Sequence, residues 1–326
     1  MNSDAPYSEL SPETVLDAIE AVGYHCDGRV LALNSYENRV YQIGIEEGDP
    51  LVAKFYRPSR WTDAAICEEH AFSGELAAQE IPVVAPLVRD GVSLHVHHGF
   101  RYAVFPRRGG RWPELGTRDE REWVGRFLGR IHAVGRAGRF YERTRLSIED
   151  LGFKARDFVL DGDWMPDYLA TKYADLTDEL LNEIEARAHD WGGASVGRIL
   201  GDCHRGNILW TDLGPHFVDL DDCLTGPAIQ DLWMLLAGGQ QEMRTELNDL
   251  LKGYEQFQPF DRGEIALIEP LRALRMIHYS GWLARRWHDP AFPQAFPWFA
   301  EPRYWEEHYR SLEEQLAAVT GPALEL

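Results

Sequence analysis

The pattern of apolar residues changes about a third of the way along this 326-residue chain, and that change limits the folds open to it. Short runs typical of β-strands come first, at 30–33, 39–45, 51–56, 92–96 and 100–105. A helix beginning at Ser11-Pro12 and one over 63–79 are expected among them. After the Arg- and Gly-rich segment Pro106–Arg111, helical spacing dominates, at 118–135, 168–189, 229–237, 242–257 and 265–287. We therefore predict an α+β chain, with a small β-rich domain at 1–105, a linker at 106–111 and a helical domain at 112–326.

Two short apolar strands interrupt the helical part, and polar residues flank them. Gly201–Trp210 holds Asp202, then Asn207, then a strand at 208–210. Asp219 follows Asn207 by 12 residues and is expected within the second strand of a hairpin, at 216–220. Such a hairpin would bring Asn207 and Asp219 together as oxygen ligands for Mg²⁺, with Asp202 free to accept a hydroxyl proton. Asp, Asn and Gly are equally common in ordinary turns, so this pattern alone leaves both interpretations open.

Lys54 is the only lysine before residue 154, and it lies in the apolar strand Leu51–Phe55. A strand lysine can hold the phosphates of a nucleotide, and a carboxylate from the next helix, Glu69 or Glu68, can position it. Lysines also occur on edge strands simply as a guard against aggregation. The turn at 34–38 lies where a kinase covers the phosphates, although it lacks a Gly-rich pattern.

Long motifs in the chain resemble the bacterial stress response kinase A family, within the aminoglycoside phosphotransferase and choline kinase-like superfamily. They are Leu33–Tyr41, Val52–Pro58, Glu68-Glu69-His70, Gly201–Trp210, Phe217–Asp222, Gly226-Pro227, Gln230–Met234 and Asp289–Pro293. The resemblance extends from about Ser11 to Trp305. It implies a bilobal protein-kinase-like fold with a small antiparallel sheet in the N-lobe and a larger, mainly helical C-lobe. It also implies an ATP- and Mg²⁺-dependent serine/threonine-protein kinase of the bacterial stress response.

The resemblance further implies roles for individual residues. Asp202 matches the proton acceptor and Asn207 and Asp219 match the Mg²⁺ ligands, Asp219 thereby also taking part in catalysis. The positions expected to contact ATP or to hold such contacts in place are Ser35, Lys54, Glu69 and Phe105, the last at the hinge against adenine.

Two further positions concern the loop that carries Asp202. Asp231 resembles a helix Asp that braces this loop through its backbone. Leu200 stands where the superfamily usually has His, which puts the stiffness of the loop in question.

The amino-acid composition limits the classes of molecule that the protein can be expected to bind. With 33 Lys and Arg against 53 Asp and Glu the formal net charge is −20, which argues against nucleic acid and anionic membranes as partners. The polar N-terminal residues, the lack of an apolar run of about 18 residues and four sparse cysteines predict a cytoplasmic protein with reduced thiols. No heptad pattern or large spare apolar face is evident, so we expect a monomer.

The phosphate acceptor stays open at this point. A protein Ser/Thr hydroxyl is one candidate, and a small molecule of the aminoglycoside, choline or sugar type is the other. A cation would suit an acidic cleft in a chain with a net charge of −20. The helix at 265–287 either lines the acceptor side or is a core helix with arginines reaching to solvent, namely Arg272, Arg275, Arg285 and Arg286. A kinase fold that only binds a partner is a third hypothesis. The presence together of the four polar residues expected for catalysis counts against it, namely Lys54, Asp202, Asn207 and Asp219.

Overall fold

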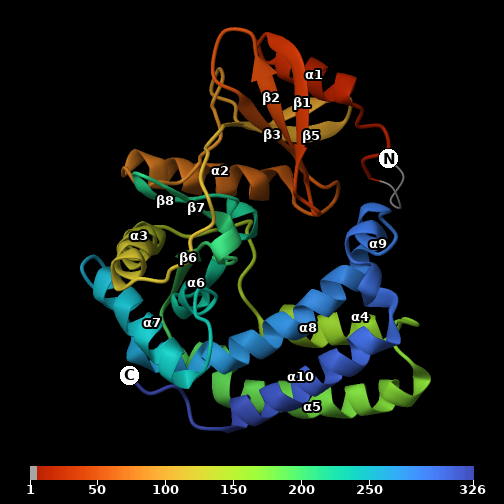
Figure 1. The fold of residues 1–326 in the computed structure, drawn as a ribbon, viewed down its shortest axis with the longest axis vertical. Helices are drawn as coiled ribbons and strands as arrows, with labels where there is room; N and C mark the ends of the chain where they lie inside the picture. The colour runs from red at the N-terminus through yellow and green to blue at the C-terminus, as the bar shows by residue number, and fades with distance from the viewer. Residues whose placement is uncertain (1–5) are drawn as a thin grey trace.

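The computed structural model describes residues 6–326, apart from the side chain at position 190. Its first part is a five-stranded antiparallel sheet with the strand order β1-β2-β3-β5-β4 (Figure 1). The strands are β1 (Cys26–Leu33), β2 (Arg39–Ile45), β3 (Leu51–Phe55), β4 (His95–His97) and β5 (Phe100–Pro106). The predicted order of helix, three strands, helix and two strands is confirmed, while β1 begins earlier and β4 is shorter than expected.

The two helices of this part lie on opposite faces of the sheet, α1 (Pro12–Ala21) on one and α2 (Asp63–Ala78) on the other (Figure 1). Side chains alternate between the two faces along a strand. Ala53 and Phe55 of β3 accordingly pack with α1 in one apolar cluster. Lys54 between them therefore faces α2, where Ile66 packs in a separate cluster. The alternation of side chains along β3 thus places Lys54 on the face of the sheet that is covered by α2, the helix that carries Glu69.

The rest of the chain is mostly helical, and together with the antiparallel sheet it makes a kinase-like α+β fold. The helices are α3 (Arg118–Arg136), α4 (Lys154–Leu160), α5 (Asp167–Ala188), α6 (Ile229–Trp233), α7 (Gln240–Tyr254), α8 (Ile268–Arg286), α9 (Ala291–Ala295) and α10 (Pro302–Thr320). Helix α6 ends at Trp233 rather than at residue 237, and a 3-10 turn at Arg262–Leu267 replaces the predicted start of α8. The sequence analysis did not predict α4, α9 and α10.

Two small antiparallel pairs of strands lie inside the helical part. One pairs β6 (Val196–Ile199) with β9 (Leu224–Pro227), which the sequence analysis missed, and the other pairs β7 (Ile208–Thr211) with β8 (Gly214–Phe217). The expectation that Asp219 lies within the second strand of this hairpin was wrong. Strand β8 ends at Phe217 because Asp219 has a left-handed backbone, with φ 56°, which cannot continue an extended strand.

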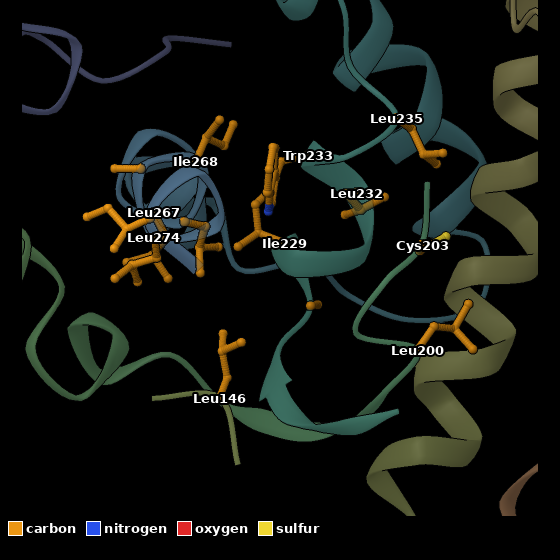
Figure 2. Packing of buried hydrophobic residues seen from close by; sticks show 14 of the residues in the cluster. Leu146, Leu200, Cys203, Ile229, Leu232, Trp233, Leu235, Leu267, Ile268 and Leu274 are labelled. Atoms are coloured by element: carbon orange, nitrogen blue, oxygen red, sulfur yellow. The ribbon is translucent and has the colours of Figure 1, made fainter. Parts of the chain in front are cut away.

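A continuous apolar core anchors the loop that follows β6. Figure 2 shows Leu200 and Cys203 of this loop together with Ile229 and Leu232 of α6, and Ile268 of α8 belongs to the same buried cluster. The apolar side chains of the loop are therefore fixed by packing against α6 and α8. All four cysteines are free thiols, two of them buried. Among the described residues, no helix is both long and apolar enough to cross a membrane.

Candidate active site

The loop from Leu200 to Asn207 owes its shape to one buried carboxylate. Asp231 of α6 is fully buried and accepts hydrogen bonds from the backbone N–H groups of Leu200 (2.7 Å) and Gly201 (2.8 Å). Its carboxylate also lies 2.9 Å from Nε2 of His132, a residue of α3. Gly201 has φ +80°, and a Cβ there would collide with the carbonyl oxygen of Asp222. Asp231 thus braces the loop as its sequence context suggested, and a histidine from another helix joins it although Leu200 is not one.

Asp202, at the centre of this loop, is surrounded by donors. Arg275 of α8 donates to its Oδ1 at 2.8 Å, and Nε2 of His204 lies 3.5 Å from its Oδ2. Asn207 donates through its amide nitrogen to the Asp202 carbonyl at 3.0 Å. Burial raises the pKa of Asp202, but the bond to His204 and the charge of Arg275 outweigh it and hold the pKa at about 2. Asp202 is therefore ionised across the physiological range and able to orient a hydroxyl donor.

Lys54 of the sheet contacts three carboxylates, two of them from the helical part and one from α2. Its side chain is only 7% exposed, and Nζ lies 2.8 Å from Asp219, 3.1 Å from Asp221 and 3.7 Å from Glu69. Burial works against the charged form, yet these carboxylates together raise the pKa of Lys54 well above its usual value. The structure therefore brings Lys54 and Asp219, which lie far apart in the sequence, into direct contact.

The two neighbouring carboxylates of α2 have different partners. Glu69 is buried beside Lys54, and its Oε2 has no hydrogen-bond partner among the described residues. Burial raises the pKa of Glu69 to about 7, although the charge of Lys54 opposes the shift. Glu68 points away from Lys54 and accepts backbone N–H bonds from residues 141, 142 and 143, at 2.7 to 2.9 Å. Glu69 is thus the carboxylate next to Lys54, and Glu68 ties α2 to the helical part.

The turn at 34–38, between β1 and β2, is fixed to α8 by an ion pair and a hydrogen bond. Glu37 lies 3.0 Å from both Arg57 and Arg286, and Trp282 donates its indole N–H to Glu37 at 2.7 Å. Burial raises the pKa of Glu37, and the surrounding arginines, Arg60 foremost, lower it below its usual value. A neighbouring contact joins the segment after β3 to the segment after α8, since Arg57 pairs with buried Asp289 at 2.7 Å. These buried charges fix the turn and the end of β3 to the C-terminal end of α8.

Two expected contacts with ATP have a less distinctive setting. Ser35 is half-buried in the 34–38 turn. Phe105 of β5 packs on the α2 side of the sheet with Tyr56, Ile66 and Ala103, and its ring lies 6.4 Å from that of His70. The roles of Ser35 at the phosphates and of Phe105 at adenine stay predictions.

The site fits a divalent cation that also binds phosphate. The Asn207 side-chain nitrogen donates a hydrogen bond to Asp202, so its side-chain carbonyl oxygen is the atom left to bind a metal ion. The Asp219 side chain is 51% exposed, and only its Oδ1 contacts Lys54. The described residues hold no group of three or more His, Cys, Asp or Glu side chains that could bind a metal by themselves. One carboxylate and one amide oxygen match the sparse protein ligation that Mg²⁺ has when phosphates supply the other oxygens.

The sequence predicts a carboxylate cluster suited to Mg²⁺ at Asp202, Asp219, Asp221 and Asp222, but it did not indicate Arg60 or the inward orientation of Asp221. Asp221 is buried, contacts Lys54, and accepts from Arg60 and from Asn38 at 3.1 Å. Arg60 also pairs with Asp222. Burial and the nearby Asp221, Asp202 and Asp219 raise the pKa of Asp222 to about 6, although the charge of Arg60 opposes the shift. The signal was present in the Asp219–Asp222 run, but nothing in the spacing shows which carboxylate faces inward.

Comparisons with known proteins agree with this geometry. Residues 29–268 match the model of the family described as phosphotransferase enzyme family. The chain belongs to this family. It is 45% identical to stress response kinase A of Escherichia coli (strain K12) over 325 residues, covering 100% of this chain and 98% of the relative. It is also 45% identical over 328 residues to serine/threonine protein kinase RdoA of Salmonella typhimurium (strain LT2), covering 100% of this chain and 99% of that protein. This phosphotransferase is therefore a member of the stress response kinase A family.

A solved structure extends the likeness at the level of the fold. Amicoumacin kinase hAmiN, in complex with AMP-PNP, Ca²⁺ and Ami, is similar with a TM-score of 0.73 at 20% sequence identity. The match covers 94% of this chain and 93% of the neighbour. The phosphotransferase thus shares the kinase-like fold of a protein whose solved complex holds an ATP analogue and a divalent cation.

Proposed function

We propose that this phosphotransferase transfers the γ-phosphate of ATP, with Mg²⁺, to a Ser or Thr hydroxyl of a protein. The contact between Lys54 and Asp219 carries the proposal. It joins a buried strand lysine to a half-exposed carboxylate, and the Asp202 loop lies in the same charge cluster. The division into a nucleotide-covering lobe at 1–105, a hinge at 106–111 and a helical acceptor lobe at 112–326 belongs to the same proposal.

Each part of the site would act through its own chemistry. Lys54 would hold the α- and β-phosphates, and Glu69 would keep its ammonium in place. Asn207 and Asp219 would hold Mg²⁺, which neutralises the charge that develops on the transferred phosphoryl group. Ser35, in the turn that Glu37 fixes to α8, would lie at the phosphates, and Phe105 would border the adenine.

Asp202 would orient the acceptor hydroxyl and take its proton as the oxygen attacks phosphorus. A carboxylate whose pKa is about 2 is a weak base. Its main contribution is therefore alignment, and proton transfer comes late, when the bond to phosphorus is already forming.

The acceptor has two candidates. The full-length likeness to a protein named as a serine/threonine protein kinase supports a protein hydroxyl. The fold likeness to amicoumacin kinase supports a small-molecule hydroxyl instead, although it rests on 20% identity. The higher identity and complete coverage favour the protein acceptor.

The test offers radiolabelled ATP and Mg²⁺ with a mixture of Ser- and Thr-containing peptides and, in parallel, with a panel of aminoglycosides and choline. Label on peptide hydroxyls alone supports the proposal, and label on small molecules alone overturns it. Asp219→Ala is expected to abolish turnover and Mg²⁺-dependent ATP binding. Asp202→Ala is expected to lose transfer while still binding ATP. Full activity in Asp219→Ala would refute the assigned metal ligand.

A further inference from the structure

A cavity of about 360 Å³ opens beside Asp202, between the 200–207 loop, α6 and α8. It is large enough for a side chain with its flanking backbone. Four of its lining residues come from one face of α8, spaced three or four residues apart, and the others come from the loop and the end of α6. The lining residues are His204, Trp233, Met234, Arg272, Arg275, Met276 and Tyr279.

The charge of this cavity is opposite to that of the whole chain. Two guanidinium groups, Arg272 and Arg275, line it, and no Asp or Glu is among its lining residues. The two arginines lie three positions apart on α8, so they are neighbours on one face of the helix. The net charge of −20 therefore does not describe the place where an acceptor would bind.

Arg272 has unused hydrogen-bonding capacity. Its Nε is buried without a hydrogen-bond partner among the described residues, and its Nη2 faces only the sulfur of Met243, at 3.2 Å. The carboxylate of Glu269 is 3.6 Å away, beyond hydrogen-bond distance. The side chain as a whole is 30% exposed and its charge is paired with Glu269, but the buried Nε–H lacks a hydrogen bond, which an incoming oxygen anion would supply.

Arg275 connects this cavity to the reacting centre. Its Nη1 donates to Asp202 at 2.8 Å, and its side chain is 43% exposed. A guanidinium has five N–H donors, so donors remain for a ligand while the bond to Asp202 persists. An anionic group held by the two arginines would consequently lie within a residue or two of a hydroxyl at Asp202.

We infer that this cavity binds an anionic group next to the acceptor hydroxyl, so that the acceptor is a Ser or Thr in an acidic peptide segment. The inference rests on the proposed protein kinase function and names its substrate class. It corrects the expectation, drawn from net charge, that a cationic acceptor would suit the cleft. The arginines of α8 differ in setting, because Arg272 and Arg275 line the cavity whereas Arg285 donates to the carbonyl of Lys154 at 2.7 Å.

The test compares three peptides of equal length with one Ser flanked by Glu, by Gln or by Lys, at saturating ATP and Mg²⁺. We expect kcat/KM to be about tenfold higher for the Glu peptide than for the Gln peptide, with the Lys peptide lowest, since a hydrogen bond to a charged group has roughly this effect. Arg272→Glu should lower kcat/KM for the Glu peptide by at least about tenfold, mainly through KM. The KM for ATP should not change.

Arg303→Glu is the matched control, because Arg303 lies on α10 with its side chain 85% exposed and paired only with Glu307 among the described residues. It changes the net charge equally, far from the cavity, and should leave the peptide preference intact. Arg272→Gln, which removes the charge without reversing it, should give an intermediate loss. ATP binding measured by calorimetry shows that each variant is folded.

The outcomes separate the two proposals. Preference for the Lys peptide, or equal effects of Arg272→Glu and Arg303→Glu, overturns the acidic acceptor while the protein kinase function stands. No transfer to any peptide, with label on a small molecule, overturns the function itself. A preference for the Glu peptide that Arg272→Glu removes and Arg303→Glu keeps supports the inference.

Discussion

Replacing Asp231 by Asn should uncouple turnover from nucleotide binding. The substitution keeps the size of the side chain but exchanges one carboxylate oxygen for an NH₂ group. Asp231 now accepts from two consecutive backbone N–H groups, those of Leu200 and Gly201, and lies against His132. An amide can accept only one of the two backbone bonds, so the other N–H would face a donor.

The magnitude follows from this count. A hydrogen bond to a charged group contributes about 1.5–3 kcal/mol, and a buried donor left without a partner costs a further ~1–3 kcal/mol. Asp231 is fully buried, so water cannot replace the lost partner. We expect the free energy of unfolding to fall by roughly 2.5–6 kcal/mol. The backbone that positions Asp202 would shift, and kcat should fall at least about tenfold, since small misplacements of reacting groups are costly.

The assay pairs urea denaturation with steady-state kinetics and calorimetry of ATP binding. Asp249→Asn is the matched control, because Asp249 is also buried and its ion-pair partners all lie on α3 and α7, namely Arg121 at 2.9 Å, Lys252 at 3.8 Å and Arg118 at 4.0 Å. It should lose stability without a loss of kcat per folded molecule. Equal kcat in Asp231→Asn and Asp249→Asn, or an unchanged free energy of unfolding in Asp231→Asn, would refute the bracing role.

Three further predictions follow from buried charges. Lys54→Met removes the cation beside the buried Glu69 and one of the cations paired with the buried Asp221, so it should lower the free energy of unfolding by about 3–5 kcal/mol and abolish turnover, measured by urea denaturation and label transfer. Glu37→Gln should weaken ATP binding about tenfold in calorimetry with kcat changed less, because the 34–38 turn loses its ion pair with Arg286 of α8. Burial, with help from Lys54, lowers the pKa of His70 to about 3 from 6.5. Its contribution to stability is therefore complete above pH 6.5 and falls toward pH 3, by about 2 kcal/mol at pH 5, a loss that His70→Gln should remove from the stability-pH profile.

The local elements were predictable where they follow from periodicity or end signals. The order of elements through residue 106 is confirmed, and helices such as α3, which begins at the Thr117 capping box, lie close to their predicted bounds. Short strands such as β6 and β9 could not be found, because four residues give too little periodicity. Asp219 lies outside the expected strand, because its own left-handed backbone does not continue β8. The spacing of residues in the sequence does not encode this backbone conformation.

The candidate site divides in the same way. Chemistry-bearing residue types at fixed spacing indicated Asp202, Asn207, Asp219 and Lys54, since these distances along the chain reflect a short loop, a hairpin and a strand. The inward orientation of Asp221 and the pairing of Glu37 with Arg286 were invisible, because their partners lie far away in the sequence.

The sequence by itself determined the fold class and the family and pointed to candidate residues for a phosphate site, because these depend on local periodicity and on motifs read along the chain. Only the tertiary structure decided that Glu69 rather than Glu68 faces Lys54, since both share one helix and packing sets its rotation. It also decided the charge of the cavity beside Asp202. A net charge is a sum over the whole surface, whereas binding depends on the few side chains that the fold brings within hydrogen-bond distance, here Arg272 and Arg275.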